Sequence, residues 1–178
     1  GVDPGLSGAS DLALGPDGYL YIADTGNSRI EVLTTTGTWV RSIPVPSAPH
    51  ALAVQTEQVY VACADHVVRC YTLTGELVGT VGRQGAQPGE FQNPRGMAMT
   101  QAGTLLVADR DNNRVQEVTT NGVYLRTLAT PGSGVGQVRA PDDVMVDLQG
   151  GIVIADTGND RLQRIAVTEE PAPVQALL

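Results

Sequence analysis

Three short segments of the chain carry an acid, an amide and a guanidinium at one fixed spacing. Each segment has the pattern Asp-x-x-Asn-x-Arg followed by an apolar residue. The nine residues are Asp24, Asn27 and Arg29; Asp109, Asn112 and Arg114; and Asp156, Asn159 and Arg161. Such a group can bind a polar ligand. It can also stabilise a turn, because Asp accepts a hydrogen bond from the backbone N–H group two residues further on and Asn tolerates the left-handed conformation. The Arg side chain can in addition bind a neighbouring repeat. We favour the structural role.

The other residues that could do chemistry form no metal or cofactor motif. Asp109, Asp111 and Asn113 have the spacing that starts a calcium loop, but the glycine and the bidentate glutamate further on are missing. His50 and His66 are the only histidines, too few for a catalytic zinc centre with three of them. Zinc-protease, phosphate-loop and nucleophile-elbow motifs are also missing. We therefore expect no cofactor and no metal.

The nine residues belong to a repeat that extends along the chain. Four apolar segments that end in Asp or Cys align with one another, and their last residues are 39, 46 and 47 positions apart: Leu20–Asp24, Val59–Cys63, Leu105–Asp109 and Ile152–Asp156. Each repeat contains four short runs of alternating apolar residues separated by turn residues, which is typical of antiparallel strands. Four strands in a repeat of about 45 residues predict the blade of a β-propeller.

We predict an all-β fold, with residues 1–178 as a single propeller domain. The repeats cover about 9–46, 47–88, 89–135 and 136–178, and the final strand is expected at Val174–Leu178. Two cysteines are too few for a disulfide scaffold, so we interpret Cys63 and Cys70 as free thiols. They do not fix the cellular compartment, for which an extracellular location is slightly favoured.

The repeats resemble those of the NHL-repeat β-propellers. The segment Tyr21–Val32 is close to the family pattern, and so is the connector Gly89–Pro94. The second repeat departs most, because Cys63 replaces the aspartate and Val67 stands where the arginine would be. We expect that this repeat lacks the ion pair of the others.

The resemblance raises a question of closure, because NHL-type propellers usually have six blades. Four such blades would leave two flanking faces and open edges uncovered. Three outcomes remain: a compact ring of four blades, a fragment of a longer chain, or a subunit whose ends are completed by a neighbour. The missing initiator Met and signal peptide lead us to expect a processed, trimmed or partial chain.

A candidate binding site comes from aligning the first strands of the repeats. In a propeller these strands line the central channel, so the residues that precede them surround one mouth. These residues are Ser10, His50, Arg95 and Asp142, followed by Asp11, Ala51, Gly96 and Asp143. Four different polar residues at equivalent positions fit recognition of a specific ligand. The alternative is that solvent-exposed loop residues vary freely, which we weigh as the stronger interpretation.

Charge limits the classes of partner. The chain has 11 arginines, no lysine and 19 acidic residues, giving a net charge of −8. Because nucleic-acid binding needs a basic patch, this charge argues against a nucleic-acid partner. No apolar run is long enough for a membrane span. Thr-rich hairpin tips at 34–36 and 119–120 leave room for O-linked glycans.

These observations favour a non-catalytic module that binds proteins or assembles with copies of itself through its open blade edges. The alternative is a propeller lyase or hydrolase that uses Ser10, His50, Arg95 and Asp142 at the channel mouth.

Overall fold

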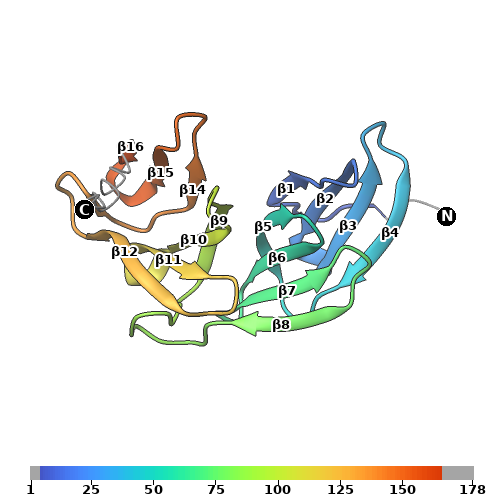
Figure 1. Cartoon of the computed structure of the whole chain (residues 1–178), viewed down its shortest axis with the longest axis horizontal. Coiled ribbons are helices and arrows are strands. Elements are labelled where there is room, and N and C mark those ends of the chain that lie inside the picture. Colours follow the sequence, from blue (N-terminus) through green and yellow to red (C-terminus); the bar gives the residue numbers. More distant parts are fainter. Residues whose placement is uncertain (1–4, 166–178) are drawn as a thin grey trace, which may run out of the picture.

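A computed structural model describes residues 5–165, which form four sheets that follow one another as blades (Figure 1). Blade 1 contains β1 (Asp11–Leu14), β2 (Tyr19–Asp24), β3 (Arg29–Thr34) and β4 (Trp39–Pro44). Blade 2 contains β5 (Pro49–Gln55), β6 (Gln58–Cys63), β7 (Val68–Thr72) and β8 (Leu77–Val81). Neighbouring strands in both blades are consecutive in the chain and antiparallel.

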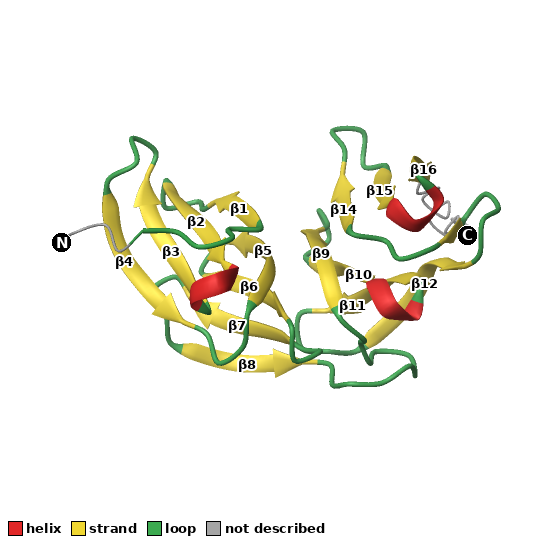
Figure 2. Ribbon diagram, turned by 180° about the vertical axis from the view of Figure 1, so that it is seen from behind, coloured by secondary structure: helices red, strands yellow, loops and turns green. Residues whose placement is uncertain are grey.

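Blade 3 contains β9 (Pro94–Met99), β10 (Thr104–Asp109), β11 (Arg114–Thr119) and β12 (Tyr124–Pro131), and the short β13 (Gln137–Val138) adds in parallel to β12. Blade 4 contains β14 (Asp143–Val146), β15 (Ile152–Asp156) and β16 (Arg161–Ile165). The predicted strand Val174–Leu178 lies outside the described residues. Three 3-10 turns, η1 (Thr25–Asn27), η2 (Arg110–Asn112) and η3 (Thr157–Asn159), follow β2, β10 and β15 (red in Figure 2). The predicted all-β propeller of four blades is confirmed.

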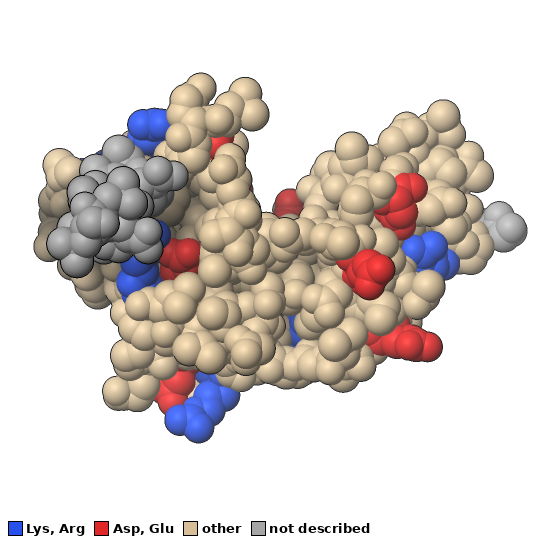
Figure 3. Space-filling view, in the orientation of Figure 1, with Lys and Arg blue, Asp and Glu red and all other residues tan. Residues whose placement is uncertain are grey.

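The blades form an open arc. The innermost strands contact one another in chain order, β1 with β5, β5 with β9 and β9 with β14. Figures 1 and 2 show blade 1 and blade 4 as the two arms of this arc. The surface between the arms is hollowed in Figure 3. One side of each end blade therefore has no neighbouring blade among the described residues.

The hydrophobic core consists of three layers, one between each pair of neighbouring blades. The blade sheets have apolar side chains on both faces, so each must pack against the sheet before it and the sheet after it. Each layer contains buried residues from both of its blades, such as Tyr21 and Val61 in the first, Val68 and Met97 in the second, and Val115 and Ile154 in the third.

Close approach of the inner strands requires a glycine at one position. Gly96 lies on β9, and a Cβ atom built there would be 2.3 Å from the Cα atom of Asp143 on β14. Any side chain at this position would push blade 4 away from blade 3.

We expect Gly96→Ala to lower the free energy of unfolding by about 1–3 kcal/mol, because the neighbouring backbone must move. The control is Gly79→Ala on β8, where an added Cβ would meet no atom within 4 Å. Urea unfolding of the two variants measures the difference, and equal stabilities would contradict the close approach.

Candidate functional site

The three repeated aspartates are fully buried at the ends of β2, β10 and β15. In each blade, one carboxylate oxygen (Oδ2) lies 2.7–2.8 Å from the Nε atom of the repeat's arginine. The side-chain amide of the repeat's asparagine donates to the same carboxylate at 2.8–3.0 Å. All nine residues of the repeated pattern therefore meet within their own blades.

The other oxygen of each carboxylate binds a backbone N–H group 17 residues earlier in the chain. Asp24 Oδ1 accepts from Ser7 N, Asp109 Oδ1 from Gln92 N, and Asp156 Oδ1 from Arg139 N, at 2.6–2.8 Å; these donors lie in the segments that lead into blades 1, 3 and 4. The prediction of a donor two residues on was wrong. The backbone that each carboxylate binds is that of the connector entering its blade, whereas among the described contacts its own turn binds it only through the asparagine side chain.

The left-handed position of the turn also differs from the prediction. It is taken by Ser28, Asn113 and Asp160, each one residue after the repeated asparagine. The asparagine itself ends the 3-10 turn, which leaves its side chain free to bind the buried carboxylate.

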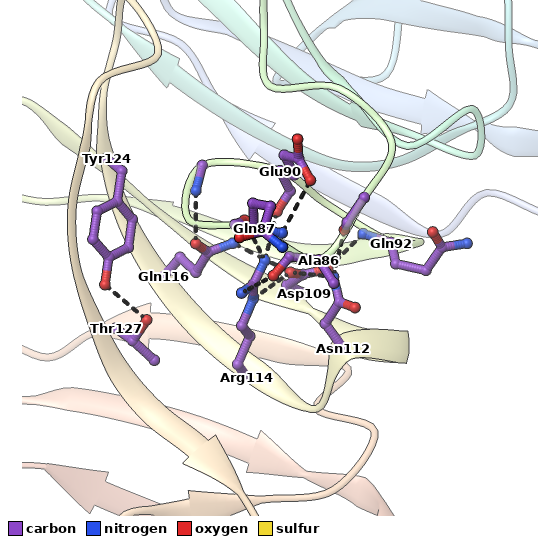
Figure 4. A network of polar contacts seen from close by, with 12 residues as sticks. Ala86, Gln87, Glu90, Gln92, Asp109, Asn112, Arg114, Gln116, Tyr124 and Thr127 are labelled. Atoms are coloured by element: carbon purple, nitrogen blue, oxygen red, sulfur yellow. Dashed lines mark hydrogen bonds and ion pairs between the residues drawn. The ribbon is translucent and has the colours of Figure 1, made fainter.

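The arginines bind the same connectors through their terminal nitrogens. In blade 3, the Arg114 guanidinium donates to the carbonyl oxygens of Ala86, Gln87 and Glu90 at 2.8–3.0 Å (Figure 4). Arg161 donates to Gly134 O and Gln137 O in the same way. This arrangement holds backbone in place and leaves little of either charge for a ligand.

Hydrogen bonding sets the ionisation of two of these carboxyl groups. Burial alone would raise the pKa of Asp24 and of Asp156, but the hydrogen bonds that each accepts outweigh burial and hold the pKa below its usual value. Burial dominates at Asp109 and raises its pKa in spite of the same set of donors. Asp24 and Asp156 are thus ionised at neutral pH and have no proton to give in acid catalysis.

Blade 2 replaces this arrangement. Cys63 is a buried free thiol whose pKa is raised to about 11 by burial. The expected absence of the shared ion pair agrees with the described contacts, but Arg69 and Asp65 form a different pair with Nη1–Oδ1 at 2.8 Å. Cys70 is also a buried free thiol.

The strand register places Ser10, His50, Arg95 and Asp142 at equivalent positions in the four blades. The residues two positions on, Leu12, Leu52, Met97 and Val144, all pair with the residue two before the end of the second strand. The alignment made from the sequence is therefore the alignment of the fold.

The side chains of these residues bind neighbouring blades. Ser10 Oγ donates to His50 O at 2.7 Å, and His50 Nδ1 donates to Pro94 O at 3.1 Å. Asp142 Oδ1 accepts from Arg110 Nε at 2.7 Å. The Nε atom of Arg95 is enclosed and has no hydrogen-bond partner among the described residues.

No nucleophile–base pair links these residues within the described part of the chain. The imidazole of His50 donates to the backbone carbonyl of Pro94, and the Ser10 hydroxyl donates to the backbone carbonyl of His50. Burial lowers the pKa of His50, and the nearby positive charge of Arg95 lowers it further, against the opposing hydrogen bond to Pro94. Among residues 5–165, no three His, Cys, Asp or Glu side chains are placed to hold a metal ion.

Sequence reasoning did not identify Thr25 or Arg110, or the role of Asp11, in joining neighbouring blades. Asp11 Oδ2 accepts from Leu52 N at 2.7 Å, Thr25 Oγ1 donates to Pro49 O at 2.8 Å, and Arg110 binds Asp142. Thr25 and Arg110 both follow a repeated aspartate, so comparison of that single position between repeats could have identified them.

A cavity lies away from Ser10, His50, Arg95 and Asp142. It has a volume of about 500 Å³ and is bounded by the β9–β10 and β14–β15 turns, with Glu117, Arg126 and Ile152 in its wall. None of the four mouth residues lines it.

The described residues also include no helix long and apolar enough to cross a membrane.

The family model for the NHL repeat matches residues 6–33 and 91–117. The chain contains NHL repeats. Each matched segment includes a first strand, a second strand and the Asp-x-x-Asn-x-Arg turn. The NHL pattern in this chain is therefore the buried connector network described above.

Similar curated proteins are E3 ubiquitin-protein ligases named TRIM71. The protein of Rattus norvegicus is 31% identical over 123 residues, and that of Xenopus tropicalis is 30% identical over 111 residues. These alignments cover 64% and 59% of this chain but only 14% and 13% of the two ligases.

Two solved lyase structures share the fold of this NHL chain. A catalytically inactive virginiamycin B lyase from Staphylococcus aureus, solved with quinupristin, has a TM-score of 0.73 at 16% identity, covering 93% of this chain and 54% of the lyase. A streptogramin B lyase has a TM-score of 0.72 at 17% identity, covering 98% of this chain and 58% of the lyase. At these identities the likeness concerns the fold alone.

We expect Arg114→Ala to lower the free energy of unfolding by about 3–5 kcal/mol, because it removes the positive charge that compensates the buried Asp109 carboxylate. The control is Arg83→Ala, whose side chain is exposed and pairs with Glu90 at the surface; its expected cost is at most about 1 kcal/mol. Denaturant unfolding compares the two. Similar small losses would contradict the structural role.

Proposed function

We propose that this NHL propeller is a non-catalytic protein-interaction and assembly module that associates through the outer faces of its two end blades. The observation that carries the proposal is the exposure of large apolar side chains on those faces. Leu12 and Leu14 are exposed on blade 1, and Met145 and Leu162 are exposed on blade 4. Exposed apolar surface of this kind is typical of a protein contact.

Two further observations support a protein partner. The repeated acids and arginines are engaged with connector backbone, so they offer a ligand little charge. The name of the TRIM71 relatives describes ligases of ubiquitin to protein, an activity that acts on proteins. The net charge of −8 argues against a nucleic-acid partner. The candidate contacts for a partner at the channel mouth are Ser10, His50, Arg95 and Asp142.

The native mass of the chain tests assembly. We expect light scattering after size exclusion to give a mass that rises above 18.6 kDa with protein concentration, because association covers the apolar end faces. A constant mass of 18.6 kDa at low and high micromolar concentrations would contradict the proposal.

A lyase or hydrolase acting at the channel mouth is the second candidate, and the fold shared with virginiamycin B lyase favours it. Incubation with quinupristin followed by mass spectrometry of the ligand tests this activity directly. We expect unchanged ligand, because His50 donates to a backbone carbonyl and does not face Ser10. Conversion that is lost in the His50→Ala variant would replace our proposal with the enzymatic one.

A further inference from the structure

The outer face of blade 1 presents residues that the other blades bury. Leu12 is 65% exposed, whereas its equivalents Leu52, Met97 and Val144 are buried against the preceding blade. The register leaves no doubt about this equivalence, since all four pair with the same position of the second strand. The face of blade 1 that carries Leu12, which we call the rear face, is thus a blade–blade contact surface that no neighbouring blade covers among residues 5–165.

The outer face of blade 4 presents the other half of such a contact. Leu162 is 74% exposed, whereas its equivalents Ile30, Val68 and Val115 are completely buried against the following blade. Met145 on β14 is also exposed, at 53%, and the equivalent residues in the other blades are alanines. We call the face that carries Leu162 and Met145 the front face.

Blade 4 also repeats the hydrogen-bonding groups with which blade 1 holds blade 2. The sequence Ile22–Asn27 is identical to Ile154–Asn159. Thr25 donates to Pro49 O across the first junction, and Thr157 is its exposed equivalent. Asp11 accepts the N–H of Leu52 in blade 2, whereas Asp143, its equivalent, binds only the N–H of its own neighbour Val144 among the described contacts.

We infer that the front face of blade 4 binds the rear face of blade 1 in a second copy of this chain, forming a head-to-tail junction that reproduces the junction of blades 1 and 2. This inference rests on the proposed function. It specifies that the partner is a second copy of the chain and that a front face binds a rear face. In the junction, Leu162 packs against Leu12 and Leu14 of the second copy, as Ile30 packs in the layer that holds Leu52. Thr157 donates to the carbonyl oxygen of Ala9, which is the equivalent of Pro49.

Such a contact is heterologous, so it leaves one front face and one rear face free in every dimer. Further copies therefore produce either a closed ring or an open helical chain.

One contact in the junction is unfavourable. Asp143 would approach the N–H of Leu12 in the second copy, where Asp11 of that copy already accepts the same group. Two carboxylates then lie close together. We expect Asp143→Asn to tighten the association by about fivefold, because it removes this repulsion.

Two variants that block one face each test the polarity. Leu12→Glu places a carboxylate on the rear face, and Leu162→Glu places one on the front face; both positions are exposed in the single chain, so folding is unaffected. Leu77→Glu is the matched control, because Leu77 is exposed on the outer strand β8. Each blocked variant should associate at least about a hundredfold more weakly, since the carboxylate would be buried without a partner. The control should associate like the natural chain.

Light scattering on a mixture of the two blocked variants tests whether the front face binds the rear face. Each retains the face that the other lacks, so we expect the mixture to form dimers of one copy of each and nothing larger. A mixture that stays monomeric, or a blocked variant that still dimerises alone, would overturn the head-to-tail junction while leaving assembly itself intact. If the natural chain is monomeric throughout, the head-to-tail junction and the proposed assembly function both fail.

Discussion

Each blade of this protein has apolar side chains on both faces of its sheet, so it needs a neighbour on both sides. A single sheet of four short strands cannot bury enough apolar surface to be stable alone. The three layers of the core supply this burial between blades 1 and 2, 2 and 3, and 3 and 4. Among residues 5–165 the same requirement is unmet at the two ends of the arc, where Leu12 and Leu162 are exposed. Stability inside the arc and the proposed association at its ends would thus have one physical cause.

The buried carboxylates solve a different problem, which is the path of the chain between blades. A connector must leave the outer strand of one blade and return to the inner strand of the next, and its backbone N–H and carbonyl groups need partners. Asp109 and Arg114 provide them for the connector into blade 3, at both its N–H and its carbonyl groups. The repeated aspartate and arginine resemble a ligand-binding pair in the sequence, but in the structure they hold the backbone of the connectors between blades.

Much of the fold could be predicted from the sequence because the repeat carries it. The spacing of Asp24, Asp109 and Asp156 defined the register of the blades, and the alternating apolar runs gave the strands. The partners of the aspartates could not be found in the same way, because the donors lie 17 residues away and are backbone groups of any residue type. At the channel mouth the sequence identified equivalent positions, but not that Ser10 and His50 would bind carbonyl groups of the next blade. Only the packed structure shows that Leu12 and its equivalents differ in exposure.

The central claim is that the front face, with its methionine, is covered when the protein acts. Met145 is exposed on that face and Met97 is buried between blades 2 and 3, so hydroxyl-radical footprinting with mass spectrometry can compare them in one sample. The account predicts that oxidation of Met145 falls as protein concentration rises, while labelling of the exposed Val135 and protection of Met97 stay constant. Equal oxidation of Met145 at all concentrations, in samples whose mass increases, would show that association uses another surface and would contradict the account.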